Sequence, residues 1–445
     1  MLALVNITTL QWDLARPLGR RWRFSVSVKR GIEMAKSYPE ERKQLKDLLP
    51  DPEPAVRRWP IISVDDHFVE PGDLFVNHLP SKFLDIAPRI VPTDDGGEVW
   101  KFPDELVPNL MTTTSIVGRP VEEWGFFPLR LDECRPGTYD VHARVADLDL
   151  AGIAASLCFP SFIFGFVGQR LHNLTDPDLA FACFRAYNDW IAEDWVGMYP
   201  DRFIPQQLPW MPDPKIAAAE IRRNADRGFK AVSFSESPEK LGYPSPHTKH
   251  WWPFFEACEE TETVVNLHIG SSSRVVAEDA VSSDCPGDVL AAMFGVNALL
   301  ASVDWVYSGV PSHFPRLKIV LSESGIDWVP YVIDRLKRHA YTTEMTGSWA
   351  DRDLSPIEVF QRNFWFTTLE DPLGFELRDH IGVDRIMVEC DYPHPDTQWP
   401  NIQDRINLEI GHLPADEISL ITHGTASAVY RHKIPTLLSS TFGEI

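Results

Sequence analysis

The chain has 445 residues, of which 44% are hydrophobic, so it can bury a large core as one domain with insertions or as two domains. Its formal net charge is -22, from 64 acidic and 42 basic residues, and such a surface opposes binding to nucleic acid and to anionic membranes. The 6 cysteines form no CxxC pair, and no stretch of about 18 uninterrupted apolar residues occurs, so we expect a reduced, cytoplasmic protein without a membrane span.

Residues 1–58 end in a charged, proline-containing stretch and are predicted to form an arm before the domain. From Pro60 onward, short apolar or β-branched runs alternate with segments of helical spacing, which is the pattern of repeated βα units. The predicted strands are 61–67, 152–162, 203–210, 229–235, 263–269, 318–324, 364–370 and 385–391. Helices are predicted at 176–196, 213–228, 251–262, 325–340 and 404–413, and the segment 414–433 is expected to close the fold as a helix.

Eight strands with eight intervening segments predict an α/β protein with a (β/α)8 barrel over residues 59–435, followed by a tail at 436–445. The structural rival is an open doubly wound sheet, but its usual glycine-rich cofactor motifs do not occur. Residues 71–140 are too long for a plain loop and are rich in proline and glycine. We therefore predict an insertion over the barrel mouth after the first strand, and a candidate substrate lid.

The active site of a parallel barrel lies at the carboxyl ends of its strands, so the side chains at these ends matter most. Here these ends carry several acidic and imidazole groups. They are Asp65, His67 and Glu70 at the first strand, His268 at the fifth, Glu323 at the sixth, and Asp391 and His394 at the eighth.

Alternate residues of a strand point to the same side, so Asp65 and His67 can face one ion together while Asp66 faces away. With His268 and Asp391 they form a mixed nitrogen and oxygen donor set that suits zinc, iron or manganese. Each position also has a plainer interpretation as a turn, a helix cap or a hydrogen-bonded structural residue. Their joint occurrence at separate strand ends favours a divalent metal site, with zinc as the expected ion.

Arg274 follows His268 closely and is a candidate for pairing with an anionic group of the substrate. A plain surface arginine is the alternative.

Several stretches together resemble one known family. They are VDDHFVEP (64–71), YNDWIAED (187–194), YPDRF (199–203), NLHIG (266–270), FPRLKIVLSESG (314–325) and CDYPHPDTQWP (390–400). In this order they resemble the amidohydrolase-related branch of the amidohydrolase superfamily, which contains the aminocarboxymuconate-semialdehyde decarboxylase-like enzymes. The resemblance implies a (β/α)8 barrel with a divalent metal and carries ligand roles onto Asp65, His67, His268 and Asp391.

The chain departs from the better-known decarboxylases of that branch at two places. They have histidine or glutamate where Asp65 stands, and a histidine followed by glycines at 323–325. Glu323, Glu70 and His394 are therefore additional candidate ligands for a second, oxygen-rich site, and one or two ions are conceivable.

The leading hypothesis is metal-assisted hydrolysis of a small organic substrate, carboxylated or cyclic, by a metal-activated water. Asp391 is expected to act as ligand and base, Glu323 to orient water or substrate, and His268 to complete the catalytic group. The alternatives are non-oxidative decarboxylation with the same metal, oxygenation by a paired iron or manganese centre, and a catalytically silent barrel acting as a partner subunit. We expect a small-molecule substrate and a homodimer or higher oligomer, with no nucleic-acid or membrane partner.

Overall fold

The computed structural model describes residues 45–274, 281–282, 289, 292–347, 349, 351 and 353–434. The predicted tail at 436–445 and residues 1–44 of the predicted arm lie outside the described residues. The described part of the arm, residues 45–58, contains no helix or strand. It runs along the domain, with backbone hydrogen bonds from Leu49 N to Gly118 O (2.8 Å) and from Ala55 N to Leu150 O (2.7 Å).

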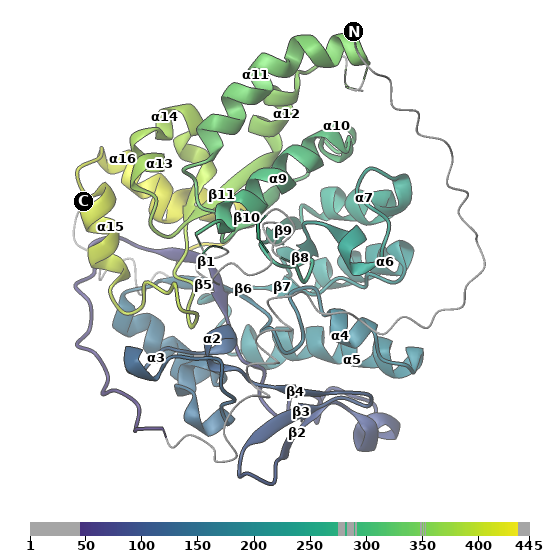
Figure 1. The fold of residues 1–445 in the computed structure, drawn as a ribbon, viewed down its shortest axis with the longest axis vertical. Coiled ribbons are helices and arrows are strands. Elements are labelled where there is room, and N and C mark those ends of the chain that lie inside the picture. Colours follow the sequence, from purple (N-terminus) through teal and green to yellow (C-terminus); the bar gives the residue numbers. More distant parts are fainter. Residues whose placement is uncertain are drawn as a thin grey trace.

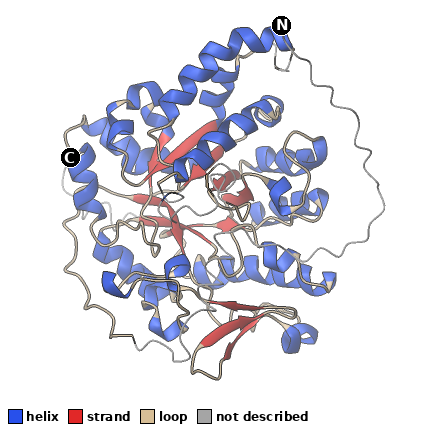
Figure 2. Cartoon of the chain, in the orientation of Figure 1, coloured by secondary structure: helices blue, strands red, loops and turns tan. Residues whose placement is uncertain are grey.

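Parallel strands form the centre of the molecule, and helices surround them (Figures 1 and 2). Each predicted strand range contains an observed strand. The central strands are β1 (Ile62–His67), β5 (Ala155–Phe159), β6 (Phe203–Ile204), β7 (Gln206–Gln207), β8 (Ala231–Ser235), β9 (Val264–His268), β10 (Ile319–Ser322), β11 (Phe364–Thr368) and β12 (Ile386–Val388).

The strands pair in chain order, which is the order of a (β/α)8 barrel, as predicted. β1 pairs with β5 and β5 with β6, and the strands from β7 to β12 pair successively, all in parallel. Pro205 separates β6 from β7. Between β12 and β1 two backbone bonds take the place of a regular ladder, from Asp391 N to Asp65 O (2.8 Å) and from His67 N to Tyr392 O (2.6 Å). We call this junction the β12–β1 seam.

The helices form the outer layer, and every helix range predicted from sequence contains observed helical structure. Asp176 and Asp213 cap α5 and α6, because each side chain accepts hydrogen bonds from backbone N–H groups of the first helical turn. The predicted ranges contain α5 (Pro177–Trp190), α6 (Pro214–Asp226), α7 (Trp252–Thr261), α16 (Ala415–Ser419) and α17 (Thr425–Tyr430), and they overlap α11 (Val329–Thr346) and α15 (Ile402–Ile410). Further helices that we did not predict are α3 (Val141–Ala151), α4 (Gln169–His172), α9 (Phe294–Tyr307), α10 (Val310–His313), α12 (Pro356–Asn363), α13 (Pro372–Glu376) and α14 (Arg378–Ile381).

The segment between β1 and α3 contains a three-stranded antiparallel sheet that the sequence analysis did not predict. Its strands are β2 (Arg89–Pro92), β3 (Glu98–Lys101) and β4 (Leu106–Pro108), and the short helix α2 (Met111–Thr114) follows. Buried Trp100 packs edge-on against Phe164 of the loop after β5, with ring centroids 4.9 Å apart. Ile116 N donates to Pro393 O (3.0 Å) in the loop after β12. The segment therefore contacts two loops that follow the carboxyl ends of barrel strands.

The inside of the barrel is apolar at one end and polar at the other. Side chains from the first residues of the strands, including Ile62, Ala155 and Val264, form a buried cluster with Tyr430 of α17. The hydroxyl of Tyr430 donates to Asn266 Oδ1 (2.9 Å), so α17 closes the amino-terminal end of the barrel. Polar side chains gather at the opposite, carboxyl end.

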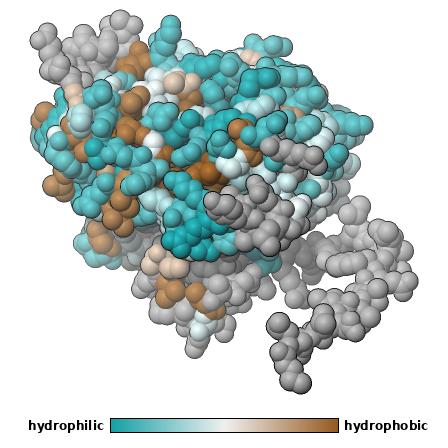
Figure 3. Space-filling model, turned by 90° about the horizontal axis from the view of Figure 1, so that it is seen from above, coloured by the Kyte–Doolittle hydropathy of each residue, from teal (hydrophilic) through white to brown (hydrophobic). Residues whose placement is uncertain are grey.

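Hydrophilic residues cover most of the coloured surface in Figure 3, and apolar residues occur in small groups between them. None of the helices in the described part of the chain has both the length and the apolar composition that a bilayer span requires.

Candidate metal centre

A bulge in β1 sets the direction of the first two candidate ligands. The register of β1 against β5 shifts between Ser63 and Asp66, so β1 carries an extra residue at this point. Val64 faces the apolar interior of the barrel, whereas Asp65 and His67 both face the polar cluster at the strand ends. The side chain of Asp66 points away from this cluster, as predicted.

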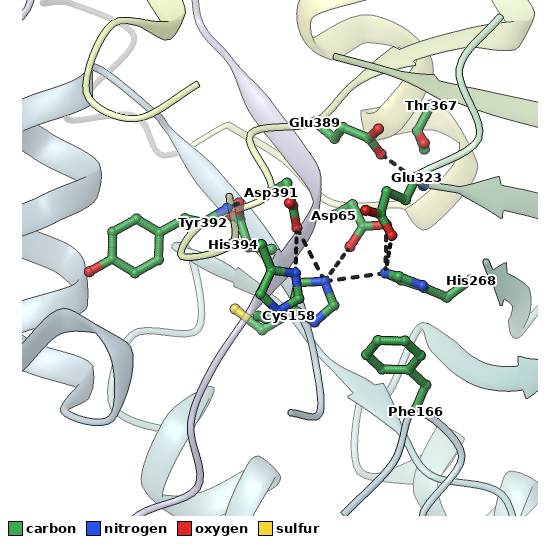
Figure 4. A network of polar contacts seen from close by, with 12 residues as sticks. Asp65, Cys158, Phe166, His268, Glu323, Thr367, Glu389, Asp391, Tyr392 and His394 are labelled. Atoms are coloured by element: carbon green, nitrogen blue, oxygen red, sulfur yellow. Dashed lines mark hydrogen bonds and ion pairs between the residues drawn. The ribbon is translucent and has the colours of Figure 1, made fainter. Parts of the chain in front are cut away.

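Four predicted ligands come together at the carboxyl ends of three different strands, and Figure 4 labels Asp65, His268 and Asp391 among them. His67 Nε2 lies 3.3 Å from Asp65 Oδ1 and 3.4 Å from Asp391 Oδ1. His268 Nε2 lies 3.5 Å from Asp65 Oδ2 and 3.2 Å from His67 Nε2. These side chains are at most 1% exposed.

The polar atoms of this cluster fit a bound cation. The carboxylate oxygens of Asp65 and Asp391 are buried, and no hydrogen bond of good geometry reaches any of them from the residues that the structure describes. Unpartnered buried carboxylates are costly unless an ion compensates them. His67 Nδ1 lies 3.4 Å from Pro160 O and His268 Nδ1 lies 2.6 Å from Ile269 O, so each ring can donate outward and turn an Nε2 lone pair to the centre.

The pKa values reflect the same coupling of opposite charges. Burial would lower the pKa of His67, but contacts with Asp391 and Asp65 outweigh it and raise this pKa to about 10. Burial would raise the pKa of Asp65 and of Asp391, but the neighbouring histidines outweigh it and lower both. The buried carboxylates thus hold positive charge beside them, and a divalent ion bound to unprotonated imidazoles supplies that charge equally well.

His394 lies beside this set and extends it. Its ring centroid is 3.9 Å from that of His67, its Nδ1 lies 3.0 Å from Asp391 Oδ1, and its Nε2 is buried without a hydrogen-bond partner. Among the residues that the structure describes, two groups of three have metal-ligand spacing: Asp65, His67 and His268, and His67, Asp391 and His394. Both groups contain His67, and its Nε2 can bind only one ion. The geometry therefore favours a single ion.

Glu323 stands at the edge of the cluster rather than inside it. Its Oε2 lies 3.5 Å from His268 Nε2, and its side chain is 13% exposed, whereas Asp65 is fully buried. Burial and the neighbouring charges of Asp391, Asp65 and Glu389 raise the pKa of Glu323 well above its ordinary value. Glu323 and Asp391 both have positive φ angles (53°), a conformation that non-glycine residues seldom adopt and that occurs often at functional sites.

Glu70 is not part of the cluster, although we named it as a candidate ligand. Its buried carboxylate accepts hydrogen bonds from Ser161 N (3.1 Å), the Ser161 hydroxyl and the Tyr187 hydroxyl (2.6 Å). The chain turns outward after β1, and these partners from the loop after β5 and from α5 hold the side chain there. Burial raises the pKa of Glu70.

Arg274 is exposed, and its backbone oxygen accepts a hydrogen bond from Ser272 Oγ (3.4 Å). It directly precedes residues 275–280, which lie outside the described part of the chain. A role for Arg274 in substrate binding stays a prediction.

Three residues near the cluster were not found from the sequence. Phe166, in the loop after β5, packs against His268 with ring centroids 4.2 Å apart. Glu236 follows β8, and its buried carboxylate accepts hydrogen bonds from the hydroxyls of Ser271 and Ser272, in the turn after His268. Glu389 accepts a hydrogen bond from Glu323 N (3.2 Å). The two glutamates stand at strand ends, a signal that could have identified them, whereas no sequence signal points to Phe166.

Comparisons with known proteins agree with this architecture. A family model described as amidohydrolase matches residues 164–432, which include His268, Glu323, Asp391 and His394 but not the ligands on β1. The decarboxylase orsB of Emericella nidulans is 28% identical over 227 residues, which are 48% of this chain and 65% of that relative. The match therefore spans slightly less than two thirds of the relative's length.

Solved structures with the same fold have lower identities. An amidohydrolase of Mycobacterium avium subsp. paratuberculosis is 23% identical, with a TM-score of 0.64 over 84% of this chain and 99% of its own. A 5-carboxyvanillate decarboxylase of Novosphingobium aromaticivorans, complexed with manganese and a nitrobenzoic acid, is 18% identical, with a TM-score of 0.60 over 87% of this chain and 100% of its own. At these identities the likeness establishes the fold alone.

The family model covers more than half of the chain, and its matched residues carry the strand ends at which the candidate ligands meet. The chain therefore belongs to the amidohydrolase family.

Proposed function

We propose that this protein is a divalent-metal-dependent decarboxylase that removes carbon dioxide from a small aromatic carboxylate. The observation that carries the proposal is the buried cluster of Asp65, His67, His268 and Asp391, whose carboxylate oxygens receive no hydrogen bond of good geometry within the described ranges. Both orsB and the 5-carboxyvanillate enzyme are decarboxylases, and this supports decarboxylation over hydrolysis, which was the leading expectation from the sequence.

The surroundings of the cluster support an aromatic substrate. Phe166 lies beside His268 and is partly exposed, and its ring centroid is 5.4 Å from that of His67. Phe159 packs against His268 from another direction, at 4.8 Å. Flat apolar rings beside a charged centre suit a substrate with a ring at one end and a carboxylate at the other.

The ion would be held by Asp65, His67, His268 and Asp391. When bound, a divalent ion neutralises oxygen charge on the substrate and so stabilises the electron pair left on the ring as carbon dioxide departs. The mixed imidazole and carboxylate donors suit manganese as well as zinc, and the manganese in the 5-carboxyvanillate decarboxylase favours manganese here.

The reaction consumes one proton for each carbon dioxide released. The carbon–carbon bond to the carboxylate breaks, its electron pair remains on the ring carbon, and a proton then forms the new carbon–hydrogen bond. Glu323 is the best-placed donor, because its partly exposed carboxyl group borders the cluster and lies 3.5 Å from His268 Nε2. His394, with 12% of its side chain exposed, lies at the same opening and can hydrogen-bond a polar group of the substrate.

The experiment measures the products directly. The purified full-length chain, loaded with Mn²⁺, is incubated with 5-carboxyvanillate and a series of hydroxybenzoates, and carbon dioxide and dissolved oxygen are followed together. We expect carbon dioxide in equal amount to substrate consumed, with no uptake of oxygen. Cleavage of amide or lactone substrates without carbon dioxide would instead support hydrolysis, and oxygen uptake that needs a reductant would support oxygenation. A metal-loaded chain that converts nothing in either series would favour the silent partner subunit.

A further inference from the structure

The two strands that carry most of the candidate ligands meet where the barrel is least regular. β1 carries Asp65 and His67, and Asp391 lies three residues after the end of β12. The β12–β1 seam has no strand ladder, and its backbone contacts are the two hydrogen bonds from Asp391 N and His67 N given above. The relative position of these ligands therefore depends on what packs behind the seam.

A buried side-chain network lies there and contacts both strands. Asp66, between the two ligands of β1, points away from the centre and accepts hydrogen bonds from the Ser156 hydroxyl, Ser63 Oγ (3.1 Å) and Tyr392 N (3.1 Å). Ser63 Oγ in turn accepts from Cys390 N (2.9 Å). Asp66 and Ser63 of β1 therefore bind backbone groups on both sides of Asp391.

Arg144 of α3 completes this network from the outside. Its guanidinium is fully buried and donates to the His67 carbonyl, to Gly137 O (2.6 Å) and to Cys158 Sγ (3.4 Å). The same group lies over the ring of Tyr392, 4.1 Å from the centroid. One side chain thus contacts the ligand residue of β1 and the residue that follows the ligand after β12.

A second residue of α3 holds the far end of Tyr392. The carboxylate of Asp147 accepts a hydrogen bond from the Tyr392 hydroxyl (2.5 Å) and forms an ion pair with Arg135 (2.6 Å). Residues three apart in a helix share a face, so Arg144 and Asp147 hold the ring and the hydroxyl of Tyr392 together. Residue 137 passes close to Asp147, and a Cβ atom there would overlap Asp147 Oδ2. Only a glycine fits at this position.

We propose that Arg144 and Asp66 clamp the β12–β1 seam and act as positioning residues for the metal centre, fixing Asp391 relative to Asp65 and His67. The inference rests on the proposed function in that it assumes a bound divalent ion. Residues that orient metal ligands from behind typically change metal affinity by about 10–100-fold when they are replaced.

The test compares metal affinity with stability in four proteins: wild type, Arg144→Met, Ser63→Ala and Arg202→Met. Arg202 is the matched control, because it is also a largely buried arginine that donates to backbone carbonyls, Ala154 O (2.8 Å) and Ile153 O (3.0 Å), but it lies at the opposite end of β5. Mn²⁺ affinity is measured from the spin-resonance signal of the free ion, and the melting temperature is measured on metal-free protein.

We expect Arg144→Met and Ser63→Ala to raise the Mn²⁺ dissociation constant by about tenfold or more. Arg202→Met should lower the melting temperature and leave the dissociation constant within about twofold of wild type. Ser63→Ala removes no charge and is therefore less disruptive to folding. If Arg144→Met does not fold, Ser63→Ala alone tests whether the clamp positions the metal ligands. Dissociation constants within twofold of wild type in the folded seam variants would overturn the clamp.

The outcomes separate this inference from the proposed function. A wild-type chain that binds no divalent ion refutes both. A wild-type chain that binds Mn²⁺ tightly, together with seam variants that bind it equally well, refutes the clamp alone.

Discussion

The ligand cluster and the seam clamp are adjacent, fully buried and rich in charge, yet their hydrogen bonding is opposite. In the clamp, both carboxylate oxygens of Asp66 and all three nitrogens of Arg144 have partners. In the cluster, the oxygens of Asp65 and Asp391 lie beside histidine rings but receive no hydrogen bond of good geometry from the described part of the chain. Two consecutive residues of one strand, Asp65 and Asp66, thus belong to different kinds of polar site.

This difference in hydrogen bonding distinguishes a structural polar network from a binding site. A buried network whose members all have partners stabilises one arrangement of the chain. A buried set of acceptors without donors is costly until a cation binds, so its folding cost is recovered only in the loaded protein. Three changes test this contrast, in order of expected effect, and a fourth, smaller one concerns a buried polar group outside both regions.

The largest effect should follow loss of both imidazole ligands. We expect His67→Ala combined with His268→Ala to abolish metal binding and to reduce decarboxylation by about 10³-fold or more, because the charge that develops in the reaction loses its main stabilisation. Metal content by elemental analysis and carbon dioxide release are the measurements. His247→Ala, at an exposed ion pair with Asp304, is the control. Unchanged metal content in the double variant would remove the basis of the proposed centre.

Glu323→Gln should separate proton donation from metal binding. Loss of a positioned proton donor typically costs about 10²–10⁴-fold in rate, so we expect a fall in kcat of this size. The Mn²⁺ dissociation constant should change by less than about threefold, because Glu323 lies at the edge of the cluster. Exposed Glu376→Gln serves as the control. A large loss of metal affinity in Glu323→Gln would instead make Glu323 a ligand.

Chelation should destabilise the wild-type protein by removing the ion that compensates Asp65 and Asp391. A free Mn²⁺ concentration of 100 times the dissociation constant adds about 2.7 kcal/mol to the free energy of unfolding. This corresponds to several degrees in melting temperature. Scanning calorimetry with and without a chelator measures this difference. The double histidine variant should show no such difference, and a chelator effect of equal size in that variant would mean that the ion binds elsewhere.

The smallest effect concerns a polar group outside both regions. Burial lowers the pKa of His172 to about 3, and its ring packs against Trp210 while Nε2 contacts Pro209 O at 2.9 Å. The ring is neutral in the native protein, whereas the unfolded chain binds a proton near pH 6.5. The contribution of the neutral His172 ring to the free energy of unfolding is therefore fully present above about pH 6.5. It is lost as the pH falls toward 3.

Replacing His172 by phenylalanine keeps the ring packing and removes this titration. The melting temperature of His172→Phe should therefore fall less than that of wild type between pH 7.5 and pH 5. The exposed His247→Phe should behave as wild type does. Equal acid sensitivity in all three proteins would assign the pH dependence to other groups, with the ligand cluster as the first to test.

The barrel and the meeting of the four candidate ligands could be predicted from the sequence because both depend on local patterns. Apolar runs alternate with helical segments, and Asp65, His67, His268 and Asp391 each stand at a strand end, where a parallel barrel brings side chains together. The choice of Glu70 as a candidate ligand relied on closeness in sequence to His67. Its carboxylate is held by Ser161 and Tyr187, whose approach to Glu70 depends on tertiary packing.

The remaining features could not be predicted because they depend on contacts between distant segments. The β2–β4 sheet has strands of three or four residues, too short for a clear alternating pattern. Arg144 and Tyr392 are 248 positions apart in number, and only the meeting of the β12 end with β1 brings them into contact. Phe166 lies beside the cluster because of the path of the loop after β5. The path of such a loop cannot be predicted from the residues of the loop alone.

The bulge in β1 makes the length of this strand part of the active centre. Ser63 and Asp66 both face the clamp, and the bulge lets two residues between them, Val64 and Asp65, face the inside of the barrel. A strand without the extra residue would place only one inward side chain between Ser63 and Asp66, so either the apolar contact of Val64 or the carboxylate of Asp65 would be lost. The length of this segment is therefore constrained as tightly as the identity of any candidate ligand.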